Sequence, residues 1–477
     1  MNKARLYKKK FPSYALFEGI VQRVMREPYT LFLDGGKRVF GSSRYSFLAL
    51  NPFLIFTCRG QHIHIRGYRQ DDFVAEDPFE IINELMAGLE IDAADEKIPF
   101  VGGAAGYLGY DMARVLENIP SRCADDIEIP DAFLGFYSSV IAADHTAQEI
   151  YALASGLPET DSALQEQRAL AEINDMLGIA GAGPAEKTCR IIAGGHCPVQ
   201  IQSNFDRQGY ENAVREIKAY IAEGEVYQVN LSQRFECCCA ASPFSVYDVL
   251  RRVSPAPYSC FFNGEGYHVL SASPESFLQM AGSRVVTRPI KGTRPRGGTE
   301  AEDRRMKAEL LNSVKDRAEL LMITDLERND LGKVCKYGSI YPEALFALET
   351  YSNVFHLVST IVGELNRGIS HVDCLKDCFP GGSITGAPKI RSMEIIEMLE
   401  RCRRKIYTGT IGYFGFNRVS DFNIVIRTLL HKDGKYYFNV GGGIVADSDP
   451  ALEYEETLHK ARGMMEALQW QAGNGRG

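Results

Sequence analysis

The sequence predicts an α+β protein whose sheets are antiparallel, and two observations support this fold class. In the N-terminal part, short runs rich in β-branched and aromatic residues alternate with glycine-rich turns, at 29–33, 53–58, 62–65 and 133–142. Such runs favour an antiparallel sheet over repeated βαβ units. Further along, the apolar residues of "YENAVREIKAYIAEG" recur at helical spacing, and the alternating run "VYQVNLSQRF" follows directly. A helix is therefore expected to lead straight into a strand.

Length and composition are those of a globular protein with a large core. The chain has 477 residues, of which 45% are hydrophobic, and this length suggests about three domain-sized units. Its 53 Lys and Arg residues against 61 Asp and Glu residues give a net charge of −8, so nucleic-acid binding is not expected. The sequence has no run of about 18 apolar residues and no apolar segment behind its basic N-terminus. We expect a cytoplasmic protein without a membrane span.

The 12 cysteines are expected to be free thiols. The CxxC pairs that zinc sites usually need are absent, and the three consecutive cysteines from Cys237 would point alternately to opposite faces of a strand. Cys374 and Cys378 could share a helical face with His371, but no fourth ligand lies nearby in the sequence. Metal binding by cysteine is therefore not predicted.

A glycine-rich stretch is the best candidate for a domain junction. Residues 178–200 include "GIAGAGPAEK" and "AGGHCP" and follow a helical pattern. We predict an N-terminal region at 1–185 and a longer C-terminal region at 200–477.

A hairpin is predicted in the C-terminal region. The runs "YHVLSASPESFLQM" and "RVVTRPIKG" flank a short turn centred near Gly282. This register would pair Glu275 with Pro289 and Ser273 with Lys291. Glu275 and Lys291 would then be diagonal neighbours on one face, roughly 7–8 Å apart between their Cα atoms. A shift of one residue would place them on opposite faces.

Two predicted helices carry carboxylates that could bind a hard cation. The first runs from about 299 to 321 and contains Asp316 and Glu319; the second follows "DSDP" and places Glu453, Glu456 and Lys460 on one stripe. Mg²⁺ takes oxygen ligands and leaves positions for water or substrate. The alternative is a solvated Glu–Lys pair worth a few tenths of a kcal/mol. Spacing alone does not decide between these readings, because no pattern shows that the helices meet.

Two glycine-rich segments and one arginine suggest anion binding. "PGGSITGAPKIRSMEIIEML" leads from a loop into a helix whose first N–H groups could face an anion, although Ala387 and Pro388 exclude a Walker A loop. The run "GGG" at 441–443 follows the strand "KYYFNV" and could donate backbone hydrogen bonds to a carboxylate. Arg427 in "NIVIRTLL" is a cation inside a predicted apolar strand, which suggests a buried anionic partner.

Taken together, these segments resemble the chorismate-utilising enzymes over most of the chain. The resemblance is carried by the ordered motifs "YQVNLSQRF", "SASPESF", "RPIKGTRPRG", "DLERNDLGKV", "HLVSTIVGEL", "PGGSITGAPKIRSMEIIE", "GTIGYFGF" and "GGGIVADSDPALEYEETLHKA". At the position of Lys291 in "PIKGT", this chain resembles the aminodeoxychorismate synthases, which carry lysine there, whereas the anthranilate synthases carry alanine. Isochorismate and salicylate synthases place a water-activating lysine where this chain has Gln228, and Gln cannot act as a base.

The resemblance implies a two-domain fold of antiparallel sheets packed face to face, with helices outside. It also implies that Lys291 attacks C2 of chorismate while Glu275 protonates the departing C4 hydroxyl. Ammonia then adds at C4 and expels the lysine, which gives 4-amino-4-deoxychorismate, a precursor of 4-aminobenzoate and folate. Arg288, Arg294 and Arg296 would favour the neutral amine of Lys291 through like charge, and burial would keep Glu275 protonated.

The same resemblance assigns the remaining site residues. The expected catalytic groups are Lys291, Glu275 and His356. Mg²⁺ would be held by Glu319 and Glu456, with Glu453 and Asp316 nearby. The expected substrate contacts are Gly292, Thr293, Tyr407, Arg427, Gly441, Gly442, Gly443 and Lys460.

The family's ammonia comes from a glutamine amidotransferase, and we find no glutaminase segment with a nucleophilic cysteine in this sequence. A separate amidotransferase subunit is therefore expected as a partner. The alternative activities are those of anthranilate synthase component I or isochorismate synthase, and the non-enzymatic alternative is a chorismate-fold binding or scaffold subunit. The segment "LFLDGG" departs from the Leu-Leu-Glu-Ser pattern of feedback-inhibited anthranilate synthases, which argues against regulation by tryptophan.

Overall fold

The computed structural model describes residues 3–35, 44–181, 200–351 and 354–473. Within these ranges the chain forms two 12-stranded antiparallel sheets, here called sheet I and sheet II. A short parallel pair joins β1 (Ala4–Arg5) to β8 (Ile91–Asp92). None of the described helices is both long and apolar enough to cross a membrane.

The strands of sheet I are, in spatial order, β19 (Ile290–Pro295), β21 (Val354–Glu364), β18 (Arg284–Arg288), β17 (Ser276–Ala281), β24 (Val419–Asn423), β23 (Thr410–Gly415), β9 (Gly103–Leu108), β10 (Ala132–Tyr137), β5 (Leu54–Arg59), β6 (His62–Gly67) and β7 (Asp71–Val74), with β20 (Tyr341–Thr350) also paired to β21. The strands of sheet II are β13 (Gln202–Ser203), β14 (Gln228–Cys238), β26 (Lys435–Ile444), β25 (Thr428–Lys432), β16 (Tyr267–Ser273), β15 (Tyr258–Asn263), β3 (Leu31–Asp34), β4 (Tyr45–Ala49), β11 (Ser139–Asp144), β12 (Glu149–Ala154) and β2 (Tyr7–Lys10), with β22 (Gly386–Ala387) paired to β14.

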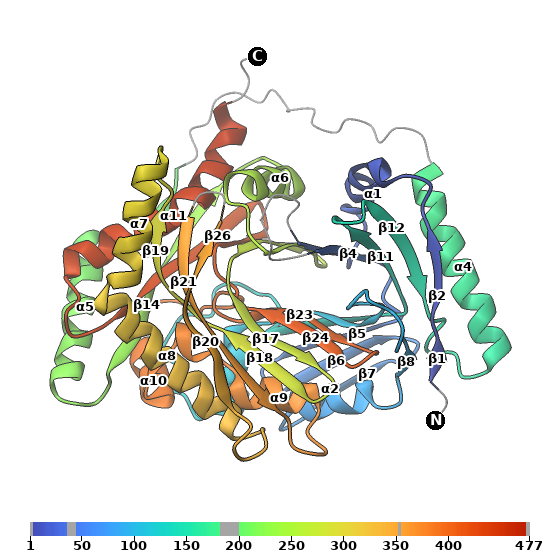
Figure 1. Cartoon of the computed structure of the whole chain (residues 1–477), viewed down its shortest axis with the longest axis horizontal. Coiled ribbons are helices and arrows are strands. Elements are labelled where there is room, and N and C mark those ends of the chain that lie inside the picture. Colours follow the sequence, from blue (N-terminus) through green and yellow to red (C-terminus); the bar gives the residue numbers. More distant parts are fainter. Residues whose placement is uncertain (1–2, 36–43, 182–199, 352–353, 474–477) are drawn as a thin grey trace.

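Helices lie on the outside of these sheets (Figure 1). They are α1 (Phe17–Val24), α2 (Pro78–Met86), α3 (Ala113–Leu116), α4 (Ser162–Gly181), α5 (Arg207–Ala222), α6 (Pro243–Val253), α7 (Glu300–Asn312), α8 (Val314–Gly332), α9 (His371–Cys378), α10 (Lys389–Leu399) and α11 (Pro450–Gly473), together with the 3-10 turns η1 (Tyr14–Leu16), η2 (Tyr110–Met112) and η3 (Gly382–Ile384).

The two sheets pack face to face through aromatic side chains. Phe133 of β10 lies 4.5 Å from Phe262 of β15 between ring centroids, and Phe47 of β4 lies 6.2 Å from Tyr413 of β23. These residues belong to the largest apolar core, which contains side chains from both sheets. A second core packs sheet II against α1, α4, α6 and α11. The predicted architecture of face-to-face antiparallel sheets with outer helices is confirmed.

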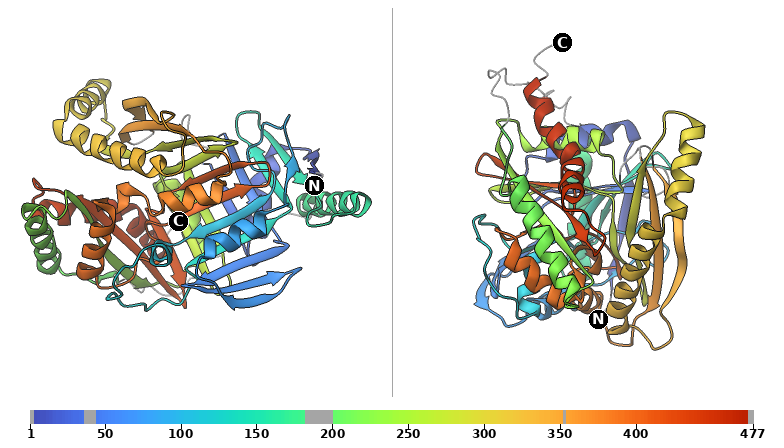
Figure 2. Two further views of the ribbon diagram at one scale, coloured as in Figure 1. Left: turned by 90° about the horizontal axis from the view of Figure 1, so that it is seen from below. Right: turned by 90° about the vertical axis from the view of Figure 1, so that its left-hand side faces the viewer.

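Both sheets combine strands from the two halves of the sequence. In sheet I, β9 pairs with β23, and in sheet II, β3 pairs with β15. Figure 2 shows these early and late strands side by side in two further views. The helix α4 ends at Gly181, and most of the predicted junction at 178–200 lies outside the described residues. The strands of the predicted regions 1–185 and 200–477 are therefore interleaved in both sheets.

The predicted hairpin forms between β17 and β18, with two differences from the expected register. First, its turn contains two residues, so Ala281 pairs with Arg284. Second, an irregularity in β17 between Ser276 and Gln279 shifts the pairing by one residue, so Ser276 pairs with Arg288 as expected. The chain also does not continue as one strand before Pro274, because β16 belongs to sheet II and β17 to sheet I. The predicted pairing of Ser273 with Lys291 is therefore wrong.

Two further strand and helix predictions need correction. The apolar run 133–142 is not one strand but β10 and β11, which belong to different sheets. The helix expected at 299–321 is broken at Ser313, whose side chain caps α8 by accepting a hydrogen bond from the Asp316 N–H. Cysteines in the described part of the chain are free, as expected.

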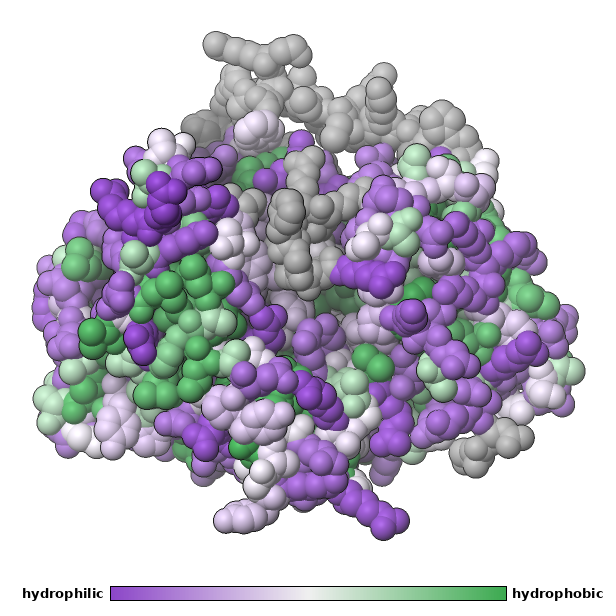
Figure 3. Space-filling view, viewed as in Figure 1, coloured by the Kyte–Doolittle hydropathy of each residue, from purple (hydrophilic) through white to green (hydrophobic). Residues whose placement is uncertain are grey.

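One face of the molecule carries an apolar patch at the edge of sheet I. Figure 3 shows it at the left of the view, over the region where Figure 1 draws β20 and α8. Exposed apolar side chains there include Leu321 of α8, and Tyr341 and Leu345 of β20. The rest of this face is mainly polar.

Candidate active site

Glu275 and Lys291 come together where the chain passes between the sheets. Glu275 follows Pro274 at the passage from β16 to β17, and Lys291 is the second residue of β19. Only 7% of Glu275 is exposed, whereas Lys291 is half-buried. Burial raises the pKa of Glu275, and the Lys291 ammonium opposes that shift most strongly. The two side chains therefore interact electrostatically, although they are not neighbours in one hairpin.

Glu275 is held in its pocket by groups from other elements. The Ser383 hydroxyl of η3 and the Ile290 N–H both favour its ionised form, as does Lys460, but burial outweighs them and its pKa stays above the ordinary value. A carboxyl group that keeps its proton beside an amine can act as a general acid. The buried position of Glu275 thus raises its pKa, as the expected role of a proton donor requires.

The arginines near Lys291 do not supply unbalanced like charge, which corrects the sequence-based expectation. Each one faces a carboxylate: Arg288 pairs with Glu349, Arg294 with Asp316 at 3.0 Å, and Arg296 with Asp303 at 2.8 Å. Lys291 itself forms no ion pair within 4 Å among the described residues, but it acts electrostatically on Glu275, Glu319 and Glu456.

Gly292, Thr293 and His356 form the wall next to Lys291. Gly292 has a left-handed backbone with φ of +80°, and Thr293 pairs with His356 of β21. The Thr293 hydroxyl lies 2.8 Å from His356 Nδ1. Burial, together with the nearby Arg427, lowers the pKa of His356 to about 4. His356 is therefore a neutral imidazole at neutral pH and can orient Thr293 without carrying charge.

The predicted carboxylates lie on the helices α8 and α11, and Lys291 acts electrostatically on Glu319 and Glu456. Glu319 of α8 is half-buried, and burial raises its pKa while Glu456 of α11 raises it further. Glu456 is half-exposed, and its Oε1 lies 2.7 Å from Lys460 Nζ, which is the largest cause of its lowered pKa. Glu453 is buried and accepts a hydrogen bond of 2.6 Å from Ser448. Glu456 of α11 therefore acts electrostatically on Glu319 of α8, which spacing alone could not show.

This carboxylate set suits a cation that keeps other ligands. The described residues include no ready-made cluster of three or more Asp, Glu, His or Cys side chains around one point. Mg²⁺, however, commonly binds through one or two carboxylates plus waters and substrate oxygens. Glu319 and Glu456, one from each helix, fit that pattern.

The three glycines lie inside β26 rather than after it, which corrects the predicted strand end. β25 pairs with β26 only at residues 435–437, so within the described residues no strand covers the second edge of β26 at 441–443. A Cβ placed on Gly442 would lie 3.3 Å from Glu453 Oε2 and 3.6 Å from Glu456 Oε1. Lys460 donates to the Gly441 carbonyl at 2.8 Å. This edge is therefore available to a ligand beside the carboxylates.

Tyr407 and Arg427 complete the polar groups near Glu275. Arg427 was predicted to lie inside a strand, but it lies in the connection between β24 and β25, with φ of +51°. Its guanidinium makes no ion pair within the described residues; burial lowers its pKa, and Glu275 partly offsets this. Burial also raises the pKa of the Tyr407 phenol. Each of the two lies within electrostatic range of Glu275, and a phenol hydroxyl and a guanidinium are both donors that suit a ligand carboxylate.

The comparisons with known proteins identify the family. A family model described as chorismate binding enzyme matches residues 36–466. The chain belongs to this family.

The most similar relatives divide between two activities. Aminodeoxychorismate synthase component 1 of Bacillus subtilis is 38% identical over 429 residues, covering 89% of this chain and 89% of that protein. Anthranilate synthase component 1 of Cereibacter sphaeroides is 39% identical over 436 residues, covering 89% of this chain and 86% of that protein. The crystal structure of anthranilate synthase component I from Streptococcus pneumoniae matches with a TM-score of 0.79 and 31% identity, covering 89% of this chain and 92% of that one.

Sequence reasoning missed two residues that organise the site of this family member. Ser383 acts on Glu275 from η3. Arg404 is buried and donates to the Asn230 carbonyl at 2.7 Å and to Glu400 at 2.7 Å, while its guanidinium lies 5.7 Å from the centre of the Tyr407 ring. Ser383 lies in the motif "PGGSITGAPKIRSMEIIE", whereas Arg404 lies outside the quoted motifs, and only the folded structure shows what either residue contacts.

A separate cavity of about 210 Å³ lies between the two sheets. Its wall includes Asp34 and Gly35 from the segment "LFLDGG", together with Tyr258 and Asp421. Burial raises the pKa of Asp421 to about 7, and Gln279 donates to it at 3.2 Å. The atypical N-terminal segment of this family member thus forms part of an internal cavity.

Proposed function

We propose that the chain converts chorismate and ammonia to 4-amino-4-deoxychorismate. The observation that carries this proposal is the placement of the Lys291 amine beside Glu275, a buried carboxyl whose pKa is raised. The resemblance at "PIKGT" supports the same branch, as does the Bacillus subtilis relative.

In this reaction Lys291 acts as the nucleophile. Its neutral amine forms a bond to C2 of chorismate, both conjugated ring double bonds shift, and the C4 hydroxyl leaves as water with a proton from Glu275. Ammonia then bonds to C4, the two double bonds return to their original positions, and the C2–N bond to Lys291 breaks. The proton lost by the incoming ammonia restores Glu275. Dividing one displacement into two lets each step use a group that is already in place.

Binding groups surround these two residues. A Mg²⁺ ion held by Glu319 and Glu456 would supply positive charge for the ring carboxylate of chorismate. Tyr407 and Arg427 offer a hydroxyl and a cation for the enolpyruvyl carboxylate, and the uncovered edge of β26 at 441–443 offers backbone N–H groups. His356, held against Thr293, keeps the wall beside Gly292 fixed.

We further propose that ammonia is supplied by a separate glutamine amidotransferase subunit. The support is the requirement for a nitrogen source, which the resembled family takes from a glutamine amidotransferase.

The second candidate is anthranilate synthesis. It is favoured by the Cereibacter sphaeroides relative and by the similarity to the Streptococcus pneumoniae structure. Both reactions use chorismate, so the position of the new C–N bond decides between them.

One assay separates the two activities. The purified chain is incubated with chorismate, Mg²⁺ and ammonium at alkaline pH, with and without 4-amino-4-deoxychorismate lyase. We expect 4-aminobenzoate only when the lyase is present. Fluorescent anthranilate formed without lyase would overturn the proposal.

A further inference from the structure

Two histidines face each other across neighbouring strands of sheet II. His268 of β16 and His431 of β25 are direct partners in the ladder, so their side chains project from the same face. Their Nδ1 atoms lie 3.3 Å apart, and their ring centres lie 5.4 Å apart. Both side chains are half-buried, so water and small ions still reach the pair.

Aromatic packing holds the two rings in place. The ring centre of Phe261 lies 6.0 Å from that of His268, and the ring centre of Tyr436 lies 4.6 Å from that of His431. Tyr436 is fully buried, and its hydroxyl donates to the Ala241 carbonyl at 2.8 Å. The orientation of the imidazoles is therefore restrained by the fold, which lowers the entropic cost of binding a ligand between them.

The spacing of the two nitrogens suits a metal ion. A separation of 3.3 Å is longer than the ~2.7–3.2 Å of an ordinary N–H hydrogen bond to oxygen. Two imidazole nitrogens that each lie ~2.0–2.1 Å from one Zn²⁺ are about 3.3–3.4 Å apart when the coordination is tetrahedral. Each neutral imidazole can carry its proton on Nε2, which leaves the Nδ1 lone pair to the metal.

The electrostatics of the pair also favour a metal ion over protons. Burial, and to a smaller extent His431, lowers the pKa of His268 to about 4. Burial likewise lowers the pKa of His431, although Asp433 in the turn between β25 and β26 opposes that shift. Both rings are therefore neutral at pH 7, and protons do not compete for their lone pairs. The negative charge of Asp433 favours a cation at His431.

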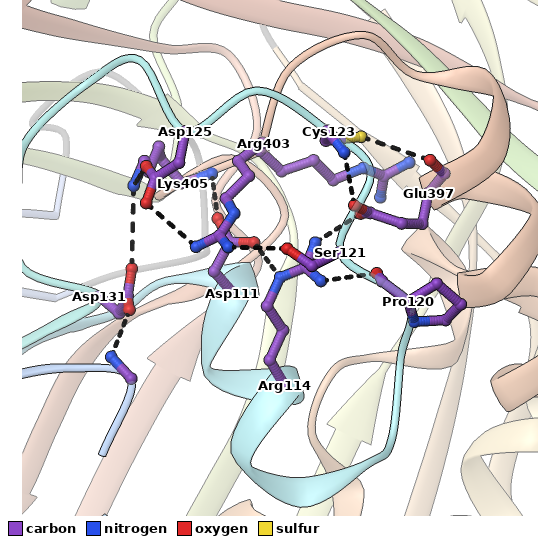
Figure 4. Close-up of polar contacts among 12 residues, drawn as sticks. Asp111, Arg114, Pro120, Ser121, Cys123, Asp125, Asp131, Glu397, Arg403 and Lys405 are labelled. Atoms are coloured by element: carbon purple, nitrogen blue, oxygen red, sulfur yellow. Dashed lines mark hydrogen bonds and ion pairs between the residues drawn. The ribbon is translucent and has the colours of Figure 1, made fainter.

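The charged cluster around Arg403 and Lys405 offers no comparable opening for a metal ion. Figure 4 shows Asp125 reaching both of these cations, with Asp131 beside Lys405. A metal ion would have to displace the cations that already pair with these carboxylates. At the histidine pair, a metal ion takes the place of one long contact between two neutral rings.

We propose that His268 and His431 chelate a transition-metal ion of the Zn²⁺ type, with water completing its coordination. Imidazole nitrogen suits Zn²⁺, Cu²⁺ and Ni²⁺, whereas Mg²⁺ takes oxygen ligands. The ion cross-links β16 to β25 and binds only the folded chain, so it stabilises the protein.

This site is distinct from the carboxylates proposed for Mg²⁺. His268 lies near the start of β16, and Glu275 follows the end of that strand. At ~3.4 Å per residue, roughly 17 Å of strand separates His268 from Ser273. The metal site therefore does not depend on the proposed function.

Zn²⁺ binding to the full chain tests the proposal by isothermal titration calorimetry, with excess Mg²⁺ present to fill carboxylate sites. His268→Gln and His431→Gln each remove one imidazole. We expect a tight Zn²⁺ site in the unsubstituted protein and an affinity at least tenfold lower in each variant. His64→Gln is the matched control, because His64 of β6 is an exposed histidine that faces Asp72 of β7, 3.2 Å away, in sheet I. Its Zn²⁺ affinity should be that of the unsubstituted protein.

Melting temperature gives a second measurement. Zn²⁺ should raise it in the unsubstituted protein and in His64→Gln, and should raise it less or not at all in the two other variants. Circular dichroism checks that each variant is folded, and two single variants keep the test valid if one of them does not fold. Unchanged Zn²⁺ affinity in the folded variants, or a loss of affinity in His64→Gln alone, would overturn the proposal. So would a lack of Zn²⁺ binding by the unsubstituted protein, and each of these results would leave the proposed reaction intact.

Discussion

Gly292 offers a quantitative test of how tightly the loop of Lys291 is packed. Its φ of +80° is costly for a residue with a side chain, by about 1–2 kcal/mol. A Cβ there would lie 2.8 Å from Leu310 Cδ1 and 3.0 Å from the Cβ of Asp316. Overpacking of this kind costs about 1–3 kcal/mol. Gly292→Ala should therefore reduce the free energy of unfolding by about 2–5 kcal/mol.

The matched control lies in the turn of the nearby hairpin. Gly282 has φ of +58°, but a Cβ there meets nothing within 4 Å, so Gly282→Ala should cost only about 1–2 kcal/mol. Urea unfolding followed by circular dichroism measures both variants. We also expect a lower kcat/KM for Gly292→Ala, because relief of the contact with Asp316 moves Lys291, and an unchanged value for Gly282→Ala. Equal losses of stability in the two variants would refute the crowding argument.

Three further predictions concern charge. Glu456→Gln should raise the Mg²⁺ concentration for half-maximal activity at least tenfold; an unchanged Mg²⁺ titration would exclude Glu456 as a ligand. The pKa of Asp421 is raised to about 7 in the folded chain, so the folded state binds this proton more tightly than the unfolded state, and stability falls as pH rises from about 4 to about 7. Asp421→Asn should thus have the higher melting temperature at pH 8 and none of that advantage at pH 4; equal differences at both pH values would contradict this. Arg404→Met should lower kcat/KM at least tenfold by releasing Tyr407 and Glu400, and normal kinetics would show that Arg404 does not position the site.

The fold class could be predicted because strand patterns survive in the sequence, but the paths between sheets could not. A period of two marks a strand without showing where the chain leaves one sheet for the other. The run 133–142 and the run around Pro274 each have the pattern of one continuous strand. In the structure each run is divided into two strands, one in sheet I and one in sheet II. Lys291 acts electrostatically on Glu275, but the pairing of Ser273 with Lys291 that suggested their proximity is wrong.

The candidate site shows the same division between local pattern and three-dimensional placement. Helical spacing put Glu456 and Lys460 on one stripe, and they do pair. That α8 would bring Glu319 to the same place depends on packing, which no spacing encodes. The unpartnered amide of Gln228 and the buried contacts of Arg404 are likewise properties of the assembled fold. The pairing of each nearby arginine with a carboxylate could not be foreseen from charge counts.

The product formed by Lys291→Ala tests the central claim most directly. The variant and the unsubstituted protein are incubated with chorismate, Mg²⁺ and ammonium, and 4-amino-4-deoxychorismate and anthranilate are separated and quantified by chromatography. If Lys291 is the nucleophile, 4-amino-4-deoxychorismate disappears, with anthranilate as the remaining product if the variant still turns over. If the variant forms 4-amino-4-deoxychorismate at the rate of the unsubstituted protein, Lys291 is not the nucleophile.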